Sequence, residues 1–571
     1  MRFQHWRPRF QTGALACVLL CAAAACGGDE TDTDTAADTV SDSAPDSAPD
    51  SASDTAPDSA SDTAPDSASD TAPDSASDTD AGPPPVLAPV AGEPNFAVAQ
   101  SGWYRGDLHY HTNYSEDAKK QGGDDLDVCL EIADAFRHPD YTSRHPELAG
   151  NGLDFIAITD HRTDAALSDP DFTHDHLIIL PGEEYGGTGH AGIWGLDHHI
   201  TQDPIAGETP AQRHLDAIAE AHAQGALFSP NHPTQDNSWV WDTPDIDAIE
   251  VWNGPWTGFY QSATVAQIEE RIASTGAENP YIRAAVTGPA DGANASAVRF
   301  WQAHLTAGVH VPIVGGSDRH MLLSAALPAT YVQKPEAEAF AALDGPALGV
   351  EGILQGIREG STFVSRSPVG PQMVLEAEDG DGKRYRMGAE LPGPGSYRVH
   401  IRVSRAEGGR ARLIAGPLRA AVDGRVTPEP AVVFDEPVTA PLVEGSFEWQ
   451  VPAEGGWLHG VVLEQLAVGP LPPEGQAILE QFSQPAEGNP LVVMGGALLP
   501  LADSSLVLDP SACDPDEWTP WMLQCMTVDV TPLPTFYVPD GIERLLNIYF
   551  EDGAVTEYSM GAITSAFLAR P

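Results

Sequence analysis

The chain has 571 residues, of which 29 are Lys or Arg and 83 are Asp or Glu, so its formal net charge is −54. This acid excess argues against a large nucleic-acid-binding surface, because phosphate affinity depends on clustered Lys and Arg. Apolar residues make up 42% of the chain, enough for substantial cores, and six cysteines are too few for a disulfide scaffold.

The N-terminus has the pattern of an export signal, in which basic residues precede a short apolar stretch, here over 13–25. The run Ala-Ala-Ala-Cys that ends at Cys26 resembles a bacterial lipobox, whose cysteine becomes the acylated first residue of the mature chain. Cys21 is a weaker competing site, and an ordinary cleaved signal is the alternative. We expect a lipoprotein signal peptide over 1–25 and a membrane anchor at Cys26. Gly27 favours the outer membrane, by resemblance to Gram-negative lipoproteins.

The next segment has the composition of a disordered linker. An Asp recurs at every fourth position from Asp34 to Asp78, in a repeat with Ser, Thr, Ala and Pro. Almost no large apolar side chain is present, so burial cannot offset the entropy of ordering. We therefore expect an extended acidic linker over 26–95. Calcium binding by the Asp repeat is a weaker alternative, because the glycine turns of calcium loops are missing.

Sixteen of the nineteen histidines lie between His109 and His320, where apolar runs alternate with helical patterns. The apolar runs cover 154–159, 176–181, 226–229, 248–252 and 311–314, and the helical patterns cover 125–136, 210–224 and 294–307. This alternation predicts an α/β fold with a mainly parallel sheet or barrel. Ligands in such folds bind at the C-terminal ends of the strands.

Five predicted strands end in or are followed by His, Asp or Glu at that same end: a first strand that ends in 106–111 and the runs 154–159, 176–181, 226–229 and 311–314. These residues are His109 and His111, Asp160 and His161, Glu183 and Glu184, His232, and Asp318 and His320. Residues i and i+2 of a strand point to the same side, so His109 with His111, and Asp318 with His320, can reach one site. This spacing predicts a metal site.

Several motifs also occur in the order typical of one enzyme family. They are GDLHYHTNYSED, DFIAITDH, LPGEEYGGTGH, FSPNHP, IEVWNG and GGSDRH, within about residues 103–365. In these motifs the chain resembles the polymerase and histidinol phosphatase (PHP) metallohydrolases, most closely the carbaryl-hydrolase-like CehA/McbA branch. The resemblance implies a distorted (β/α)7 barrel over 96–368 that holds two or three divalent metal ions. Members of this family mostly hydrolyse phosphate esters, and some act on other esters or carbamates.

The resemblance also implies a role for each ligand. The first metal would bind His109, His111 and Asp318; Glu184 would bridge to the second metal, completed by His190 and His232; the third would bind Asp117, His161 and His320. Glu116 is the alternative to Asp117. Asp160 is expected to orient an imidazole, and Glu184, Asp318 and His320 to carry catalysis. The nitrogen and oxygen ligands suit Zn, Mn or Fe.

Candidate substrate contacts are less specific. Arg162 and Arg319 could bind phosphate, although Arg319 alternates with two ligands and is expected to face away from the metals. Lys119 and Lys120 are either substrate contacts or surface residues. An aromatic group lies beside the site in sequence and is read as core packing or as the wall of a pocket: Trp239, Trp241, Trp252, Trp256, Phe259 and Tyr260.

The chain after the barrel alternates apolar and polar residues between Gly and Pro, which predicts a β-rich, sandwich-like accessory domain over 369–499. The segment 500–571 has no assigned role. Cys513 and Cys525 could form a disulfide in an oxidising compartment, and Cys129 is expected to be an inert buried thiol.

Taken together, these patterns predict an exported metal-dependent hydrolase of a small-molecule ester, with a phosphoesterase favoured. A carbamate, amide or carboxylic-ester hydrolase is the second possibility, and a non-catalytic metal-containing binding module is the third. A serine nucleophile is not indicated, because the chain has no Gly-x-Ser-x-Gly elbow. Nucleotide use is not indicated either, because a Walker loop is missing.

Overall fold

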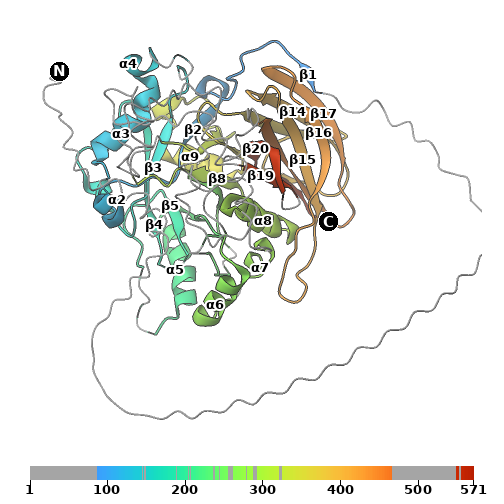
Figure 1. Cartoon of the computed structure of the whole chain (residues 1–571). Helices are drawn as coiled ribbons and strands as arrows, with labels where there is room; N and C mark the ends of the chain where they lie inside the picture. The colour runs from blue at the N-terminus through green and yellow to red at the C-terminus, as the bar shows by residue number, and fades with distance from the viewer. Residues whose placement is uncertain are drawn as a thin grey trace, which may run out of the picture. The chain divides into compact units, whose positions relative to one another are not determined.

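A computed structural model describes the chain from Leu87 to Gln465 and over 548–571, with internal gaps (Figure 1). The gaps are at 122, 144–145, 147–148, 188, 203–204, 206, 236–237, 243–244, 255–261, 278, 287–291, 321–324 and 552–553. The signal peptide, Cys26, most of the linker and the Cys513–Cys525 pair lie outside the described residues. Within the described part, no helix is both long enough and apolar enough to cross a membrane.

The first half of the described chain alternates strands with helices. Its strands are β2 (Trp103–Asp107), β3 (Phe155–Ile158), β4 (Ile178–Tyr185), β5 (Ala191–Trp194), β6 (Leu227–Pro230), β7 (Ile249–Asn253), β8 (Ile313–Gly316), β9 (Ala329–Gln333) and β10 (Thr362–Ser365). Its helices are α2 (Glu116–Gln121), α3 (Leu126–Asp134), α4 (Pro139–Thr142), α5 (Pro210–Ala223), α6 (Val265–Thr275), α7 (Ile282–Ala285), α8 (Ala293–Thr306) and α9 (Gly349–Arg358). The five predicted strands and three predicted helices are confirmed, with shifts at their ends.

The helix boundaries follow from capping residues. Thr209 accepts a hydrogen bond from the Gln212 backbone at the start of α5, and a proline occupies the first turn. Thr264 and Gln267 form a capping box at the start of α6. That helix ends at Gly276, whose φ of 66° is the left-handed conformation that glycine adopts without steric cost.

The large sheet is mixed, and the prediction of a mainly parallel sheet is wrong. Strands β2, β3 and β4 are parallel, whereas β5 runs antiparallel to both β4 and β6, and β9 runs antiparallel to β2 and β10. The physical reason at β5 is the short connection from β4, since a tight turn joins only antiparallel strands. Strands β7 and β8 form a separate parallel pair.

The backbone pairing of the described strands does not close into a barrel. Side-chain hydrogen bonds still hold β8 beside the large sheet: Thr330 Oγ1 of β9 accepts from Gly315 N at 2.8 Å, and Thr362 Oγ1 of β10 donates to Ile313 O at 2.7 Å. Strand β8 therefore lies against β9 and β10 without pairing with them through backbone hydrogen bonds.

The second half is β-rich, as predicted. Its strands are β11 (Gln372–Glu378), β12 (Arg384–Arg386), β13 (Glu390–Leu391), β14 (Ser396–Ser404), β15 (Arg410–Pro417), β16 (Ala431–Pro437), β17 (Leu442–Gln450), β18 (Gly456–Gln465), β19 (Ile548–Glu551), β20 (Ala554–Thr564) and β21 (Phe567–Ala569). A five-stranded sheet has the order β1-β17-β14-β11-β12, where β1 is Ala88–Pro89. Strand β1 lies inside the range predicted as linker, so ordered structure begins before residue 95.

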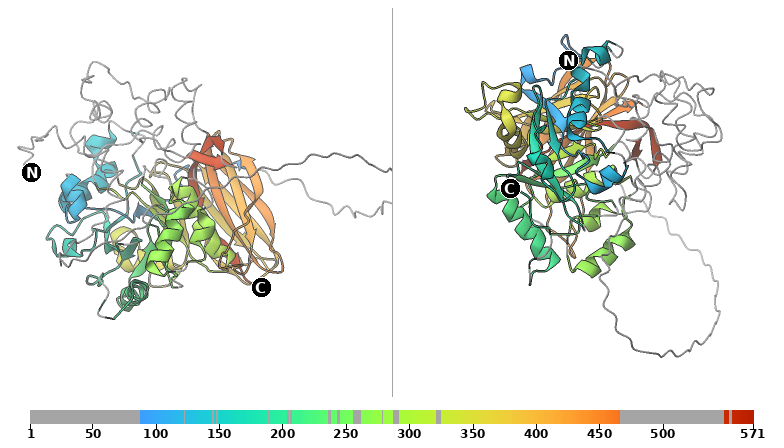
Figure 2. Two further views of the ribbon diagram at one scale, coloured as in Figure 1. Left: turned by 60° about the horizontal axis from the view of Figure 1, so that its bottom comes forward. Right: turned by 90° about the vertical axis from the view of Figure 1, so that its left-hand side faces the viewer.

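Two layers of strands pack face to face in this half. Leu375 and Val399 of the five-stranded sheet share one buried cluster with Leu413 and Val462 of β15 and β18. The orange strands β14–β17 gather on one side of the molecule, away from helices α2–α5 (Figures 1 and 2). The arrangement is a sandwich.

The two halves share one continuous sheet. Strand β20 pairs antiparallel with β10 of the first half and with β18 of the second. Residues 548–571, to which the sequence assigned no role, thus join the site-bearing strands to the sandwich. A buried ion pair between Arg366 and Glu464 spans the same junction.

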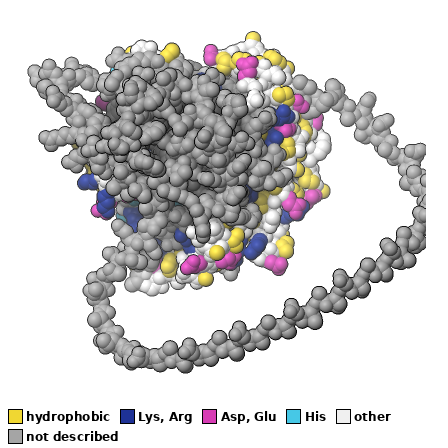
Figure 3. Space-filling view, in the orientation of Figure 1, with side chains coloured by type: hydrophobic (Ala, Val, Ile, Leu, Met, Phe, Trp, Pro, Cys, Tyr) yellow, Lys and Arg dark blue, Asp and Glu magenta, His cyan; other side chains and the backbone are white. Residues whose placement is uncertain are grey.

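The outer face of the five-stranded sheet is exposed to solvent and carries cross-strand ion pairs. Arg398 pairs with Glu448 at 2.7 Å and Arg402 with Glu444 at 3.2 Å, each directly opposite in the β14–β17 register. Basic and acidic side chains are correspondingly interspersed where described residues are visible in Figure 3. Such exposed pairs contribute little to stability, on the order of 0–1 kcal/mol each.

Candidate metal centre

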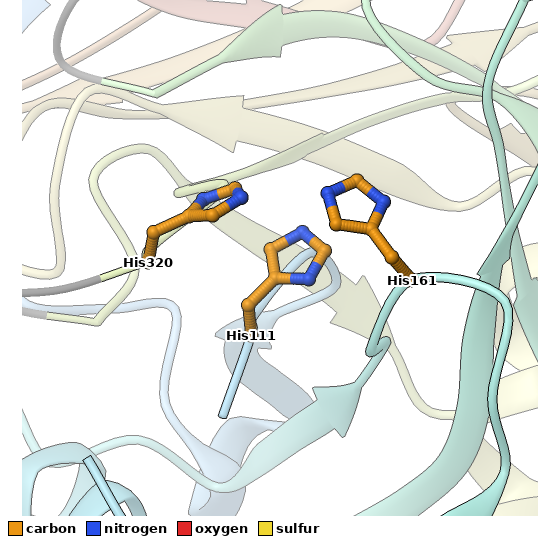
Figure 4. A group of neighbouring side chains, drawn as sticks. All are labelled: His111, His161 and His320. Carbon is orange, nitrogen blue, oxygen red and sulfur yellow. The ribbon is translucent and has the colours of Figure 1, made fainter. Parts of the chain in front are cut away.

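Nine side chains predicted as ligands come together at one edge of the sheet. His109 and His111 follow β2, Asp117 lies in the first turn of α2, His161 follows β3, Glu184 is in β4, His190 precedes β5, His232 follows β6, and Asp318 and His320 follow β8. The imidazoles of His111, His161 and His320 face one another (Figure 4). Residues more than 200 positions apart in the sequence thus meet within one cluster.

Two glycines allow the close approach of these segments. The turn between β4 and β5 brings His190 back opposite Glu184, and it passes through Gly186 at a φ of 115°, where a Cβ would lie 2.2 Å from Gly189 O. At the end of β8, a Cβ on Gly316 would lie 2.3 Å from His109 Cβ. A side chain at either position would separate elements that carry ligands.

Glu184 is the centre of the cluster. Its Oε1 lies 3.2 Å from His109 Nε2, 3.2 Å from His190 Nδ1 and 3.3 Å from His232 Nε2. Its Oε2 lies 2.8 Å from His161 Nδ1 and 3.6 Å from His111 Nε2. One buried carboxylate therefore faces five imidazoles, with its two oxygens directed at different groups of them.

The other two carboxylates complete the cluster. Asp318 Oδ1 lies 3.3 Å from His109 Nε2 and 3.2 Å from His111 Nε2. Asp117 Oδ2 lies 3.0 Å from His161 Nε2 and 3.1 Å from His320 Nε2. Of the two carboxylates weighed for this position, Asp117 faces the site, because the Glu116 side chain is 80% exposed and lies beside Lys120.

The donor atoms form three overlapping groups in which all atoms lie within 4.8 Å of one another. These are His109, His111 and Glu184; His111, His161 and His320; and His161, Glu184 and His190. Each group is a potential ligand set for one metal ion, and His111, His161 and Glu184 each belong to two of the groups. His111, predicted as a ligand of the first metal only, also lies beside His161 and His320, two of the predicted ligands of the third metal.

The donor set fits divalent cations by two criteria. First, Glu184 Oε2, His190 Nδ1 and His232 Nδ1 are buried and have no hydrogen-bond partner of normal geometry among the described residues. A buried polar atom without a partner costs about 1–3 kcal/mol, which coordination would offset. Second, imidazole nitrogens and carboxylate oxygens without thiolates suit Zn, Mn or Fe.

The electrostatics keep the carboxylates charged. Burial raises the pKa of Glu184, but His190 and His109 outweigh it and the net pKa is well below the ordinary value. The pKa of Asp318 is likewise held well below its usual range, because His109 and His111 overcome the effect of burial. Burial, with His320 and His161 nearby, lowers the pKa of His111 to about 3. The His111 ring is thus neutral, which is the form that binds a metal. Burial lowers the pKa of His161, but Glu184 and Asp117 outweigh it and raise this pKa to about 10.

Among the described residues, Asp160 reaches an imidazole only through a neighbouring hydroxyl. Its oxygens accept hydrogen bonds from the backbone and hydroxyl of Thr112 at 2.8 Å and from Ser115 Oγ at 2.8 Å. Ser115 Oγ in turn lies 3.0 Å from His111 Nδ1. Asp160 therefore acts on His111 through the Ser115 hydroxyl, by ordering the loop after β2.

Besides Ser115, three further residues that contact the ligands were not singled out from the sequence. Asn231 Nδ2 donates to Glu184 Oε1 at 3.0 Å. Glu250 and Asn253 of β7 contact His109 and Asp318 respectively. All three lie inside the quoted motifs FSPNHP and IEVWNG. Asn231 and Asn253 are amides rather than His, Asp or Glu, and Glu250 lies within a strand rather than after it, so the pattern of His, Asp and Glu after strands does not include them.

The two arginines proposed for phosphate differ in placement. Arg319 is fully buried, pairs with Asp124 at 2.6 Å and lies over the Tyr110 ring, which confirms that it faces away from the ligands. Arg162 is exposed and its Nε donates to Gly186 O at 2.9 Å, so it holds the β4–β5 turn that precedes His190.

The remaining candidates belong to the core or the surface. Trp239, Trp241 and Trp252 are buried in one hydrophobic cluster, whereas Trp256, Phe259 and Tyr260 lie outside the described residues. Lys119 and Lys120 are exposed. Cys129 is fully buried, and burial raises the pKa of its thiol to about 12, as expected for an inert thiol.

A further group of donors, Asp134, His174 and His176, lies on the surface. His174 Nδ1 accepts backbone hydrogen bonds from His176 and Leu177 at 3.1 and 3.3 Å, so a neutral ring carries its proton on Nε2. Arg137 Nε also lies 3.2 Å from Asp134 Oδ1. These contacts occupy part of the donor set, and none of its three members is buried.

Comparison of the chain with protein-family models, with curated proteins and with solved structures found no match. The resemblance to PHP metallohydrolases accordingly rests on the sequence motifs. The geometry of the nine side chains is independent of that resemblance.

Proposed function

We propose that this protein is a metal-dependent hydrolase of the PHP type, with two or three divalent ions held by the nine clustered side chains. The observation that carries the proposal is the position of Glu184, whose two oxygens face five imidazoles from different strand ends. A carboxylate with two oxygens is suited to bridge neighbouring cations. The strands β2–β10 are proposed to correspond to the distorted barrel of that family.

Substrate access follows from the exposure of the ligands. The side chains of Asp117, His161 and His320 are 34%, 23% and 18% exposed, whereas those of His109, His111 and Glu184 are at most 1% exposed. The substrate is therefore proposed to enter from the side of Asp117, with the buried ligands behind the reacting atoms.

Bound divalent ions supply water with a pKa lowered to about 7 and positive charge for the scissile group. Glu184 would hold the ions at a fixed separation. Asp318 carries negative charge at the accessible side and is proposed to accept the proton of the attacking water. The Nε2 atoms of His320 and His161 both lie near Asp117 Oδ2. His320 is proposed to orient the scissile group on the exposed side of the centre, where Asp117 lies.

A phosphate ester is the favoured substrate class, and a carbamate, amide or carboxylic ester is the second candidate. The burial of Arg319 against Asp124 favours the second candidate, because it withdraws one of the two predicted phosphate-binding cations from the site. Arg162, whose Nε donates to Gly186 O in the turn before His190, is the remaining basic candidate.

The test is a substrate screen of the purified protein loaded with Mn²⁺ or Zn²⁺. Aryl phosphates are compared with aryl carboxylic esters and carbamates that share the same leaving group, so that only the scissile group differs. We expect turnover of phosphates to exceed that of the uncharged esters. The reverse preference would replace the phosphoesterase by the second candidate, and well under one ion per chain with no turnover would leave a non-catalytic binding module.

The cellular location is proposed from the leader sequence. Acylation at Cys26 would tether the enzyme to the outer membrane through the acidic linker, and small-molecule esters would be its partners. The net charge of −54 favours substrates that reach the site as small molecules over polyanions held on the protein surface.

A further inference from the structure

Strand β7 (Ile249–Asn253) carries none of the nine predicted ligands, yet it contacts three of them. Glu250 Oε1 lies 3.0 Å from His109 Nδ1, and Glu250 Oε2 accepts the backbone N–H of His232 at 2.7 Å. Asn253 Nδ2 donates to Asp318 Oδ2 at 3.2 Å. These three ligands follow β2, β6 and β8, so one strand connects ligands from three different elements.

Glu250 and Asn253 also contact each other. Asn253 Nδ2 donates to Glu250 Oε2 at 3.1 Å, and Gln235 Nε2 donates to Asn253 Oδ1 at 3.3 Å. The second contact fixes the orientation of the Asn253 amide, so that its NH2 group faces the two carboxylates. Both side chains are at most 4% exposed, and water does not compete for these hydrogen bonds.

A β-bulge brings the two residues to one face of the strand. Residues three apart in a regular strand point to opposite faces. In the β7–β8 ladder, however, Glu250 pairs with Val314 and Trp252 pairs with Gly315, so Val251 is an extra residue. The extra residue shifts the alternation by one position, and Glu250 and Asn253 then point the same way.

Each contact acts on a ligand atom. A carboxylate can only accept a hydrogen bond, so beside Glu250 a neutral His109 ring carries its proton on Nδ1 and its free electron pair on Nε2, which faces Glu184 and Asp318. His232 has a φ of 29°, a conformation that costs energy in a residue with a side chain, and the Glu250 contact holds its backbone there.

Asp318 is held in the same manner. Its φ is 49°, and its Oδ2 is occupied by the Asn253 amide. The other oxygen, Oδ1, is left to face His109 and His111. The contacts of β7 thus determine which atom of His109 and of Asp318 faces the centre, and they hold the backbone of His232.

We propose that Glu250 and Asn253 are a positioning pair that sets the metal affinity of the centre by orienting His109, His232 and Asp318. The inference rests on the proposed metal-dependent function. The two residues are not proposed as ligands. Removing such an orienting partner in other metal sites weakens metal binding about 10–100-fold.

The test measures the dissociation constant of Mn²⁺ or Zn²⁺ by titration of the metal-free protein. We expect Glu250→Gln to weaken binding at least tenfold, because one amide oxygen cannot accept from both His109 and His232 and its NH2 group faces a second donor. Asn253→Ala is the second variant. It removes the amide that donates to Asp318 Oδ2 and Glu250 Oε2, and it leaves both carboxylates in place. Circular dichroism and the melting temperature of each metal-free variant report the fold separately.

Glu464→Gln is the matched control. Glu464 is also a buried carboxylate, 4% exposed, but it pairs with Arg366 at the junction with the sandwich. We expect this variant to lower the melting temperature without changing the metal dissociation constant, the opposite pattern to Glu250→Gln.

The outcomes separate this inference from the proposed function. If the wild-type protein binds metal and both Glu250→Gln and Asn253→Ala bind it within twofold of wild type, the positioning role is wrong and the metal centre stands. If the wild-type protein binds no divalent metal, the proposed function fails and the positioning role fails with it.

Discussion

Glu116 and Asp117 are neighbours in the first turn of helix α2 and their side chains point in different directions. The Glu116 side chain is 80% exposed and lies 3.5 Å from Lys120 Nζ, one turn further along the helix. The Asp117 carboxylate instead lies between the imidazoles of His161 and His320. Of these two adjacent acids, Glu116 is therefore a surface residue and Asp117 is a candidate metal ligand.

This pair allows a matched test of the third metal position. We expect Asp117→Asn to lose one bound ion per chain and to lower turnover at least tenfold, because the neutral amide is a weaker ligand between two imidazoles. Glu116→Gln removes the same charge one residue away and should retain both properties. Metal analysis and turnover of the two variants provide the comparison; equal behaviour of the variants would contradict the assignment.

Glu184→Gln is expected to abolish turnover and to leave the fold intact. The substitution keeps the size of the side chain but removes the negative charge and one of the two acceptor oxygens that face five imidazoles. Circular dichroism should be unchanged while the rate falls at least 100-fold. Activity close to wild type in a correctly folded variant would mean that Glu184 is misassigned.

Metal removal should lower the stability of the folded protein. Three buried polar atoms of the centre, Glu184 Oε2, His190 Nδ1 and His232 Nδ1, have no hydrogen-bond partner of normal geometry among the described residues. An ion at 100 times its dissociation constant adds about 2.7 kcal/mol to the free energy of unfolding. The melting temperature should therefore fall after dialysis against a chelator and recover with Mn²⁺ or Zn²⁺, but not with Na⁺ at equal ionic strength. A melting temperature insensitive to chelation would argue against bound ions.

Two buried histidines predict a loss of stability in acid. His304 and His459 are at most 2% exposed, and burial lowers the pKa of each to about 4 from the ordinary value of 6.5. The unfolded chain binds protons below pH 6.5 that the folded protein does not, so their contribution is present above pH 6.5 and is lost as the pH falls toward 4. For each histidine, the free energy of unfolding falls by up to about 3 kcal/mol over this pH range.

The measurement is the free energy of unfolding between pH 7 and 4 for wild type and His459→Gln. Gln302 Nε2 lies 3.0 Å from His459 Nε2 and donates to it, which a glutamine oxygen could accept in place of the ring. We expect the variant to lose less stability over this range than wild type. His198→Gln, at an exposed position, should leave the slope unchanged. Equal slopes for all three proteins would refute the prediction.

Membrane attachment is tested at the leader. Cys26→Ser should move the protein from the membrane fraction to the soluble fraction of cells that express it, because the acyl chains would have no attachment site. Cys21→Ser is the control that keeps the predicted anchor and should remain on the membrane. Persistence of the Cys26→Ser protein on membranes would remove the lipoprotein proposal.

Much of the site was accessible from the sequence because its signals are local. A ligand that follows directly after an apolar strand is recognised by its position, and the pairs His109–His111 and Asp318–His320 follow from the alternation of a strand. The helix predicted over 210–224 is α5, and the run 154–159 contains β3. All nine predicted ligands lie in one cluster.

Only the tertiary structure decided the rest, because it depends on pairing between distant segments. The antiparallel β5, the choice of Asp117 over Glu116 and the joining of β20 to β10 each depend on contacts that no short window of sequence contains. The role of Glu250 and Asn253 depends on a single extra residue in β7, which reverses the face that alternation alone predicts. The sequence by itself determined which side chains can serve as ligands; the register of the strands decided which residues orient them.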